Sequence, residues 1–370
     1  MTRAALVLAG GAGARMRRSR GDERPKPLVE VRGASLLERN LCALVGAGFD
    51  AIWVAHGEAQ RAIAAATASF AERAHRRGVT VEALVEAAPL GTIGAAGLLR
   101  GRVEALVTVN ADNLCALDLG ALAARHAATG ADLTLASHRH AWRLPYGELL
   151  VDGDRVAGYR EKPAHLSRIA SAICALGPAA LDAIDGPTGL PALAERLLAA
   201  GRDVRAFDHD AAWIDVNDAA DADRADALVA ATPALEQWAP RPDVEVVGAV
   251  LRDGDRLLLE RRFDTSPAGL WDTPGGKLEP GETPAAALVR ELREELGLVL
   301  ADAGPEIACF DTLEPGGTIL RHHVFARAVR AADTRACEGQ ILEWFARGAL
   351  PPERARVVAR SLAALDAGEA

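Results

Sequence analysis

The stretch Ala4-Ala-Leu-Val-Leu-Ala-Gly-Gly-Ala-Gly-Ala-Arg-Met16 decides the fold of the N-terminal half. Its apolar residues predict a buried strand, and Gly10, Gly11 and Gly13 follow that strand in a tight turn. Glycines let backbone N–H groups approach a phosphate closely, and a helix after the turn would direct its positive end at the same anion. Met16 stands where a dinucleotide fingerprint has its third glycine, so the meaning of this turn depends on the motifs around it.

Strand-like runs alternate with amphipathic helical stretches as far as residue 231. Strands are expected at Ala4–Ala9, Ala51–Ala55, Val79–Val85, Ala105–Val109, Asp132–Ala136 and Val204–Phe207, and helices at Leu36–Val45, Gln60–Arg77, Leu119–Ala128 and Leu193–Ala200. This alternation predicts an α/β domain with a mainly parallel sheet that helices cover on both faces.

A change in the pattern of apolar residues after residue 231 predicts a second domain. Residues 232–242 hold three prolines and no periodicity, which is typical of a linker between a domain at 1–231 and another at 243–370. Beyond the linker, Val244–Leu251 and Arg256–Glu260 predict two strands around a turn, and a strong helix follows at Pro284–Leu296. A further helix is expected from about Pro352. These patterns predict a smaller α+β domain.

Composition narrows the class of protein. Half of the residues are apolar and a quarter are charged, which is typical of a soluble globular chain. The net charge of −9 and the short extent of the one basic run, Arg15–Arg20, argue against a nucleic-acid partner. No apolar run reaches the roughly 18 residues of a membrane span, and glycines follow the first strand too early for a signal peptide. We therefore expect no membrane partner.

Cysteine and lysine usage adds two expectations. The five cysteines include no Cys-x-x-Cys pair, so we expect neither a disulfide framework nor a zinc site, and predict a cytoplasmic protein with reduced thiols. Only three of the 42 basic residues are lysines: Lys26, Lys162 and Lys277. In a chain that uses arginine almost everywhere, a remaining lysine is expected where a compact ammonium is required. All three lie in motifs.

Six motifs follow the glycine turn in order. They are Pro25-Lys26-Pro27-Leu28, Glu86 ahead of Pro89-Leu90-Gly91-Thr92, Val109-Asn110-Ala111-Asp112, Tyr146-Gly147, Glu161-Lys162-Pro163 and Trp213-Ile214-Asp215-Val216-Asn217. Together they resemble the sugar-1-phosphate nucleotidyltransferases (nucleotide-sugar pyrophosphorylases). The resemblance covers roughly residues 3–230 and implies a Rossmann-like sheet with the active site at the carboxyl ends of its strands.

The same resemblance assigns roles to the matching positions. It implies that the triphosphate of an NTP binds Gly10, Gly11, Gly13 and Arg15, and that Lys26 neutralises phosphates during transfer. It also implies that Glu86 and Gly91 lie beside the base and ribose, and that Asp112 and Asp215 hold Mg²⁺ (or Mn²⁺). Glu161 and Lys162 are implied to contact the sugar phosphate. Such roles suit the reaction, because attack of a phosphate on the α-phosphorus needs cations and positioning rather than a covalent nucleophile.

On the acceptor side the sequence departs from that family. Ser171-Ala172-Ile173 stands where the family usually has Asn-Ala-Gly, and Thr188 or Gly189 stands where an acidic residue is common. We therefore expect the acceptor to be the 1-phosphate of an unusual sugar or of a cyclitol.

A second motif occupies residues 276–298, GKLEPGETPAAALVRELREELGL. Thr283 and Pro284 supply a helix N-cap and an N1 proline. Glu291, Glu294 and Glu295 follow at i, i+3 and i+4, so their carboxylates share one helix face. Like charges so placed destabilise a bare helix, and a bound divalent cation relieves the repulsion.

This segment resembles a complete Nudix box, whose family cleaves a nucleoside diphosphate derivative with Mg²⁺ (or Mn²⁺) and an activated water. The resemblance implies metal binding by Glu282, Glu291, Glu294 and Glu295, orientation of a glutamate by Arg290, and a phosphate contact for Lys277. Arg261-Arg262 and Glu338-Gly339-Gln340 extend the similarity to MutT-type diphosphatases, in which the glutamate matching Glu338 is a metal ligand or base. Leu350–Arg354 lacks the asparagine that reads oxidised guanine in that type.

The motifs together predict a bifunctional enzyme that makes an NDP-sugar or NDP-cyclitol and hydrolyses a nucleotide. Two alternatives stay open: a Nudix hydrolase with a non-catalytic nucleotide-sugar-sensing domain, and a transferase regulated by a Nudix-like binding module. His322-His323 is expected on a strand with one ring on each face and without a metal role. His138 and His140 are expected in a loop, and Cys115 as a small buried residue.

Overall fold

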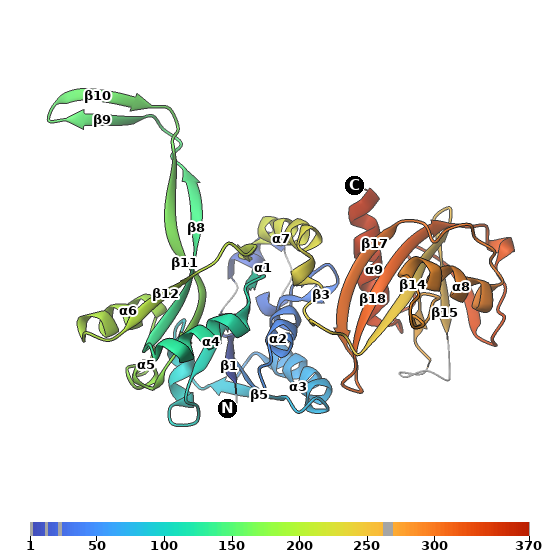
Figure 1. Cartoon of the computed structure of the whole chain (residues 1–370), viewed down its shortest axis with the longest axis horizontal. Coiled ribbons are helices and arrows are strands. Elements are labelled where there is room, and N and C mark those ends of the chain that lie inside the picture. The colour runs from blue at the N-terminus through green and yellow to red at the C-terminus, as the bar shows by residue number, and fades with distance from the viewer. Residues whose placement is uncertain (1–2, 12–13, 21–23, 262–268, 370) are drawn as a thin grey trace.

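The computed structural model describes residues 3–11, 14–20, 24–261 and 269–369 (Figure 1). Its N-terminal sheet has the strand order β12-β8-β11-β6-β1-β4-β5. The strands are β1 (Ala4–Leu8), β4 (Ala51–Gly57), β5 (Thr80–Glu86), β6 (Leu106–Asn110), β8 (Leu133–Arg143), β11 (Ala164–Leu176) and β12 (Val204–Asp208). β11 is antiparallel to both of its neighbours and the other pairs are parallel, so the mainly parallel sheet is confirmed.

Helices cover both faces of this sheet, because alternate strand residues are apolar on each side. Ala5 and Val7 of β1 pack in one cluster with α2 (Leu36–Gly46), α3 (Arg61–His75) and α4 (Leu119–Thr129). Ala4 and Leu6 pack in another cluster with η2 (Gly94–Leu99), α5 (Pro178–Asp182) and α6 (Leu190–Ala199).

Short elements gather near the carboxyl end of β6. They are α1 (Ala14–Arg20), η1 (Lys26–Leu28), β2 (Glu30–Val31), β3 (Ala34–Ser35), β7 (Asn113–Cys115), β13 (Trp213–Asp215) and α7 (Ala219–Ala231). Met16, Leu114 and Val216 join α7 in a cluster of their own. This cluster holds the segments that carry the sequence motifs in fixed positions.

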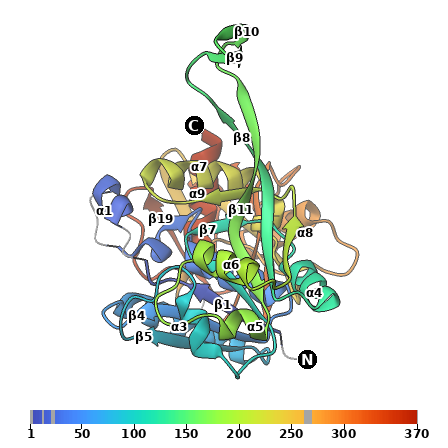
Figure 2. The same ribbon diagram turned by 90° about the vertical axis from the view of Figure 1, so that its left-hand side faces the viewer.

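A long arm leaves the sheet (Figures 1 and 2). β8 and β11 continue past the sheet as a two-stranded ribbon, and a hairpin of β9 (Glu148–Asp152) and β10 (Arg155–Arg160) forms its tip. His138 and His140 lie in β8, so the expectation of a loop there was wrong. Pairing with β11 extends β8 to Arg143. Because the outer residues of β8 are exposed on both faces, the sequence there has no alternation of apolar and polar residues that would predict a strand.

The C-terminal sheet has the strand order β16-β15-β14-β18-β17, and β19 pairs with β15. The elements are β14 (Val244–Asp253), β15 (Arg256–Arg261), β16 (Trp271–Asp272), α8 (Pro284–Leu296), β17 (Glu306–Leu313), β18 (Ile319–Ala328), η4 (Ala331–Asp333), β19 (Ile341–Ala346) and α9 (Arg356–Glu369). α8 packs on one face through Val247 and Ala249, and α9 packs on the other through Val250 and Val324.

The segment between the two sheets is packed rather than free. It contains η3 (Pro233–Leu235), and Ala239 is buried in the same cluster as α2 and α3. Leu313 and Ile319 of the C-terminal sheet belong to that cluster too. The two halves therefore share one apolar core. Within the described residues, no helix has both the length and the apolarity that crossing a bilayer requires.

Candidate active sites

The first site is centred on Lys26, at the start of η1. Its Nζ donates to Asp112 Oδ2 at 2.6 Å and to Asn217 Oδ1 at 2.9 Å. Asn217 in turn donates through Nδ2 to Asp215 Oδ2 at 2.8 Å. Three segments far apart in sequence thus meet, and the structure brings together Lys26, Asp112 and Asp215, three of the predicted site residues.

Strand pairing explains how the two aspartates meet. Asp112 follows β6 and precedes β7, while Asp215 ends β13 opposite Asn113 of β7. Burial raises the pKa of Asp215, the hydrogen bond from Asn217 lowers it, and the negative charge of Asp112 raises it again. Two carboxylates that repel each other in this way form an oxygen-rich site that suits a divalent cation.

The nucleotide-side residues lie at the ends of β1 and β5. Glu86 is buried and accepts a hydrogen bond from the backbone N–H of Leu90 at 3.0 Å. A Cβ on Gly10 would lie 2.9 Å from Glu86 Oε1, so this close approach requires glycine. A Cβ on Gly91, at φ +80°, would lie 2.7 Å from the carbonyl oxygen of Thr188.

The glycine turn itself is only partly described. Gly11 has open space where a Cβ would be, and its carbonyl oxygen accepts a hydrogen bond from Gln60 Nε2 at 3.4 Å. Arg15 is exposed on α1. Gly13 lies outside the described residues, as does Arg262 of the second domain.

A histidine cluster that sequence reasoning missed adjoins this site. The buried Ser171 hydroxyl contacts His138 Nδ1 and His209 Nε2, both at 2.8 Å. The carbonyl oxygen of Ser171 accepts hydrogen bonds from Asn113 and Trp213, the neighbours of Asp112 and Asp215. Burial lowers the pKa of both histidines, and their mutual proximity lowers that of His138 further. The departure at Ser171 was the available signal, but the partners are distant in sequence.

Two predicted acceptor residues lie elsewhere. Glu161 and Lys162 lie between β10 and β11, where the hairpin joins the ribbon of the arm that projects from the sheet (Figure 1). Glu161 accepts a hydrogen bond from the hydroxyl of Tyr159 at 3.0 Å, and Lys162 has φ +43°. The structure does not bring them to Lys26.

The second site is organised by Arg290 of α8. Its guanidinium donates to both carboxylate oxygens of Glu282, at 3.0 and 2.9 Å, and to Glu291 Oε1 at 2.8 Å. It also donates to Glu294 Oε2 at 3.4 Å and to the carbonyl oxygen of Lys277 at 3.0 Å. Hydrogen bonds from Arg290 lower the pKa of Glu282, and those with Glu282 and Glu291 raise the pKa of Arg290. Arg290 therefore positions glutamates.

The entry loop of α8 lies against the same carboxylates. Gly275 donates its N–H to the buried Glu295 Oε2 at 3.0 Å, and a Cβ on Gly276 would overlap the carboxylate of Glu291. The α8 N-cap forms as expected, because Thr283 Oγ1 accepts from the N–H of Ala286.

A cavity of about 520 Å³ brings together three of the four glutamates predicted to be catalytic in this domain, and Glu294 is not among its lining residues. Glu291, Glu295, Glu338 and Lys277 line it, and so does His322. The carbonyl oxygen of Glu295 accepts from the N–H of Cys337 and from the side chain of Gln340, which fixes the chain on both sides of Glu338. Glu294 is the more exposed glutamate of the box. His323 lines a different cavity, so the two rings point to opposite faces as expected.

Comparisons with known proteins match both halves of the chain. Residues 4–227 match the family model described as nucleotidyl transferase, and residues 242–365 match the model described as NUDIX domain. The chain is 31% identical to D-glycero-alpha-D-manno-heptose 1-phosphate guanylyltransferase of Aneurinibacillus thermoaerophilus, over 44% of this chain and 68% of that protein. It is 42% identical to CTP pyrophosphohydrolase of Escherichia coli (strain K12), over 27% of this chain and 74% of that protein.

A solved structure aligns with the N-terminal part. HddC from Yersinia pseudotuberculosis has a TM-score of 0.47 and 22% identity, over 61% of this chain and 99% of that chain. The chain thus combines two enzyme classes, a nucleotidyl-transferring domain and a pyrophosphohydrolase domain. It belongs to the nucleotidyl transferase family, whose model spans more than half of it, and its C-terminal part is a NUDIX domain. Both families generally use divalent metals.

Proposed function

We propose that the protein is a bifunctional enzyme, with domains at 1–231 and 243–370 joined by residues 232–242. The first domain transfers a nucleotidyl group from an NTP to a sugar or cyclitol 1-phosphate and releases pyrophosphate. The second hydrolyses a nucleoside diphosphate derivative of the NTP type. The observation that carries the transferase is Lys26, held between Asp112 and Asn217 at the carboxyl end of β6.

In the transfer step, an oxygen of the acceptor phosphate forms a bond to the α-phosphorus of the NTP, and the bond to the pyrophosphate oxygen breaks. Asp112 and Asp215 fit a hard divalent cation, for which we propose Mg²⁺ or Mn²⁺. Such a cation offsets negative charge on the phosphates. Lys26 supplies a further compact positive charge, and we assign phosphate binding to Gly10, Gly11, Gly13 and Arg15.

In the hydrolytic step, Glu291, Glu295 and Glu338 fit one or more cations of the same kind, because their carboxylates line one cavity. A bound cation activates water and neutralises phosphate charge. Arg290 holds Glu282 and Glu291 in place, Glu294 completes the box, and Lys277 at the cavity rim is available to bind phosphate. We assign Glu338 the role of a ligand or of the base that accepts a proton from the water.

The relatives narrow the substrates to test first. One is named for guanylyl transfer to a heptose 1-phosphate and another for hydrolysis of CTP. Hydrolysis of the NDP-sugar would undo the transfer and consume a triphosphate at each cycle, and a short connection between domains would aggravate this. We therefore expect the NUDIX site to prefer a free NTP, ordinary or damaged, over the product of the first domain.

The test uses the full-length chain with each NTP, a panel of sugar and cyclitol 1-phosphates, and divalent cations. We expect acceptor-dependent pyrophosphate release that Asp112→Asn abolishes, while NTP hydrolysis persists. Glu291→Gln should abolish hydrolysis and spare transfer. In the Asp112→Asn chain, the NDP-sugar should be hydrolysed more slowly than the best NTP.

Other outcomes support the two alternatives. An N-terminal domain that binds an NDP-sugar but never releases pyrophosphate would be a sensor. A NUDIX domain that binds nucleotides without metal-dependent hydrolysis would be a regulatory module. Loss of both activities from either substitution in a folded chain would contradict two separate sites.

A further inference from the structure

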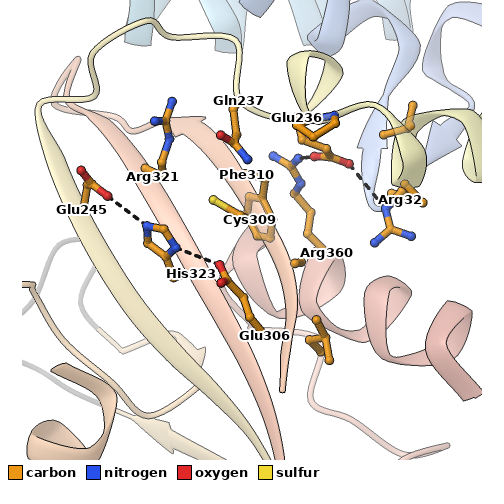
Figure 3. A pocket seen from close by; sticks show the side chains of 15 residues that line it. Arg32, Glu236, Gln237, Glu245, Glu306, Cys309, Phe310, Arg321, His323 and Arg360 are labelled. Carbon is orange, nitrogen blue, oxygen red and sulfur yellow. Dashed lines mark hydrogen bonds and ion pairs between the residues drawn. The ribbon is translucent and has the colours of Figure 1, made fainter. Parts of the chain in front are cut away.

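A second group of metal-ligating side chains lies on the C-terminal sheet, outside the cavity of the Nudix glutamates. Glu306 and Cys309 come from β17, His323 comes from the adjacent β18, and Glu245 comes from β14 on the other side of β18 (Figure 3). They line a cavity of about 510 Å³ that also borders the connecting segment between the domains. Nothing in the proposed reactions uses these residues.

The ligand atoms are close enough to share one ion. The thiol sulfur of Cys309, one ring nitrogen of His323 and a carboxylate oxygen of Glu306 all lie within 4.8 Å of one another. Cys309 and His323 are directly opposite each other in the antiparallel ladder, so their side chains emerge on one face. His323 Nδ1 lies 2.8 Å from Glu306 Oε1, so this ring nitrogen faces the carboxylate ligand.

The far side of the ring is also arranged as a metal site requires. His323 Nε2 lies 3.0 Å from Glu245 Oε2, which gives the ring a carboxylate partner on the side away from Cys309 and Glu306. A metal-ligating histidine almost always donates its other N–H to such a group, because this fixes the tautomer and orients the ring. Glu245 thus forms a carboxylate–histidine pair through Nε2, which leaves Nδ1 on the side of Glu306.

We propose that Glu306, Cys309 and His323 bind a divalent cation of the Zn²⁺ class, with Glu245 positioning the His323 ring. A thiolate, an imidazole and a carboxylate suit a borderline transition metal rather than Mg²⁺, which prefers oxygen ligands throughout. Three protein ligands leave a coordination position open to solvent in the cavity. The proposal does not rest on either enzymatic activity.

The alternative is a protonated His323 that pairs with two carboxylates. Burial lowers the pKa of His323, but hydrogen bonds with Cys309, Glu245 and Glu306 outweigh burial and raise the pKa to about 9. The cluster therefore attracts positive charge in either case. The ion pair can form without the thiol, whereas a Zn²⁺-class site needs it as a ligand. Replacing Cys309 therefore distinguishes the metal site from the ion pair.

The experiment equilibrates the full-length protein with Zn²⁺ in a large excess of Mg²⁺, which occupies the all-oxygen sites, and counts retained zinc after dialysis. We expect one Zn²⁺ per chain, loss of it in Cys309→Ser, and roughly 10–100-fold weaker binding in Glu245→Gln. Cys337→Ser is the matched control, because Cys337 is an exposed thiol next to Glu338. It should retain zinc.

Cobalt supplies an independent readout. Co²⁺ bound to a thiolate gives a sulfur-to-metal charge-transfer band, and we expect this band in the wild type and in Cys337→Ser but not in Cys309→Ser. Unchanged circular dichroism and nucleotide hydrolysis in Cys309→Ser would show that the variant is folded. Absence of retained zinc in the wild type, equal retention in Cys309→Ser, or loss in Glu291→Gln alone would overturn the proposal.

Discussion

Lys26 illustrates how much a single side chain can depend on its shape. Its ammonium reaches Asp112 and Asn217 at 2.6 and 2.9 Å, and its side chain is only 11% exposed. A planar guanidinium is larger and has fixed donor directions, so it cannot replace a compact ammonium in this space without moving its partners.

We therefore expect Lys26→Arg to lower kcat for transfer by about 10²-fold, the size typical of losing one preorganised charge-stabilising donor. Formation of the NDP-sugar or NDP-cyclitol at saturating substrates measures this loss, because NTP hydrolysis by the second domain also releases pyrophosphate. NTP hydrolysis by the same chain is the internal control and should be unchanged. Transfer at the wild-type rate would show that charge alone suffices at this position.

Gly276 offers a similar test in the NUDIX domain. A methyl group at this position would overlap the carboxylate of Glu291, so Gly276→Ala should displace that ligand. We expect hydrolysis to fall by at least about tenfold with a raised metal requirement, since misplaced catalytic groups lose rate steeply. Metal titrations of the hydrolysis rate measure it. Gly348→Ala is the control, because a Cβ there meets nothing within 4 Å, and an equal effect of both variants would contradict the argument.

At this scale the sequence predicts residues that lie in short, local patterns. Lys26, Asp112 and Asp215 were predictable because each sits in a compact motif at a strand end or turn. The pairing of Ser171 with His138 and His209 was not, because it depends on the register of β8 against β11 and on β12. The ligand group around His323 could not be predicted from the sequence for the same reason, because three strands contribute its residues.

Among the elements, the arm is the part that periodicity could not predict. Apolar residues mark strands and helices that bury one face, and most of those in the two sheets were found in this way, whereas β11 and α7 were not among the expected elements. The outer part of the arm buries neither face: Tyr146 is 72% exposed and Tyr159 is 63% exposed. Cross-strand hydrogen bonding maintains it, together with side-chain contacts such as the stacking of Trp142 on His165 and the ion pair of Arg160 with Glu148.

The position of the arm predicts the behaviour of Lys162. Because the tip projects from the sheet and Lys162 does not meet Lys26, we expect Lys162→Ala to leave kcat and the KM for NTP unchanged. Steady-state kinetics with varied NTP and varied acceptor measure this. A rise confined to the acceptor KM would instead mean that the tip reaches a transfer site, by bending or from another copy of the chain.

On the scale of the whole molecule, buried ion pairs connect the two domains. Glu236 pairs with Arg360 of α9 and with Arg39 of α2, and Arg32 Nε lies 3.5 Å from it. Burial lowers the pKa of Arg39 to about 10 and lowers that of Arg360 as well, and both guanidinium groups contact the Glu236 carboxylate. Arg356 adds a bond from α9 to Glu38 of α2 at 2.6 Å.

Removing the carboxylate of Glu236 should lower the stability of the folded chain. Glu236→Gln removes the carboxylate that the buried Arg39 and Arg360 both contact directly, and we expect a loss of about 3–5 kcal/mol in the free energy of unfolding. Urea denaturation of the full chain measures it. The exposed Glu343→Gln should be neutral, and a neutral Glu236→Gln would show that the arginines find other partners.

The shared core also makes the two domains one thermodynamic unit. Leu313 and Ile319 are buried among residues of α2 and α3, so neither half can melt without exposing apolar surface of the other. A calorimetric scan should then show a single endotherm instead of two. A nucleotide that binds only the transferase site would, by mass action, raise the melting temperature of the NUDIX domain as well. Each substrate would thus protect both active sites against heat, whichever site it binds.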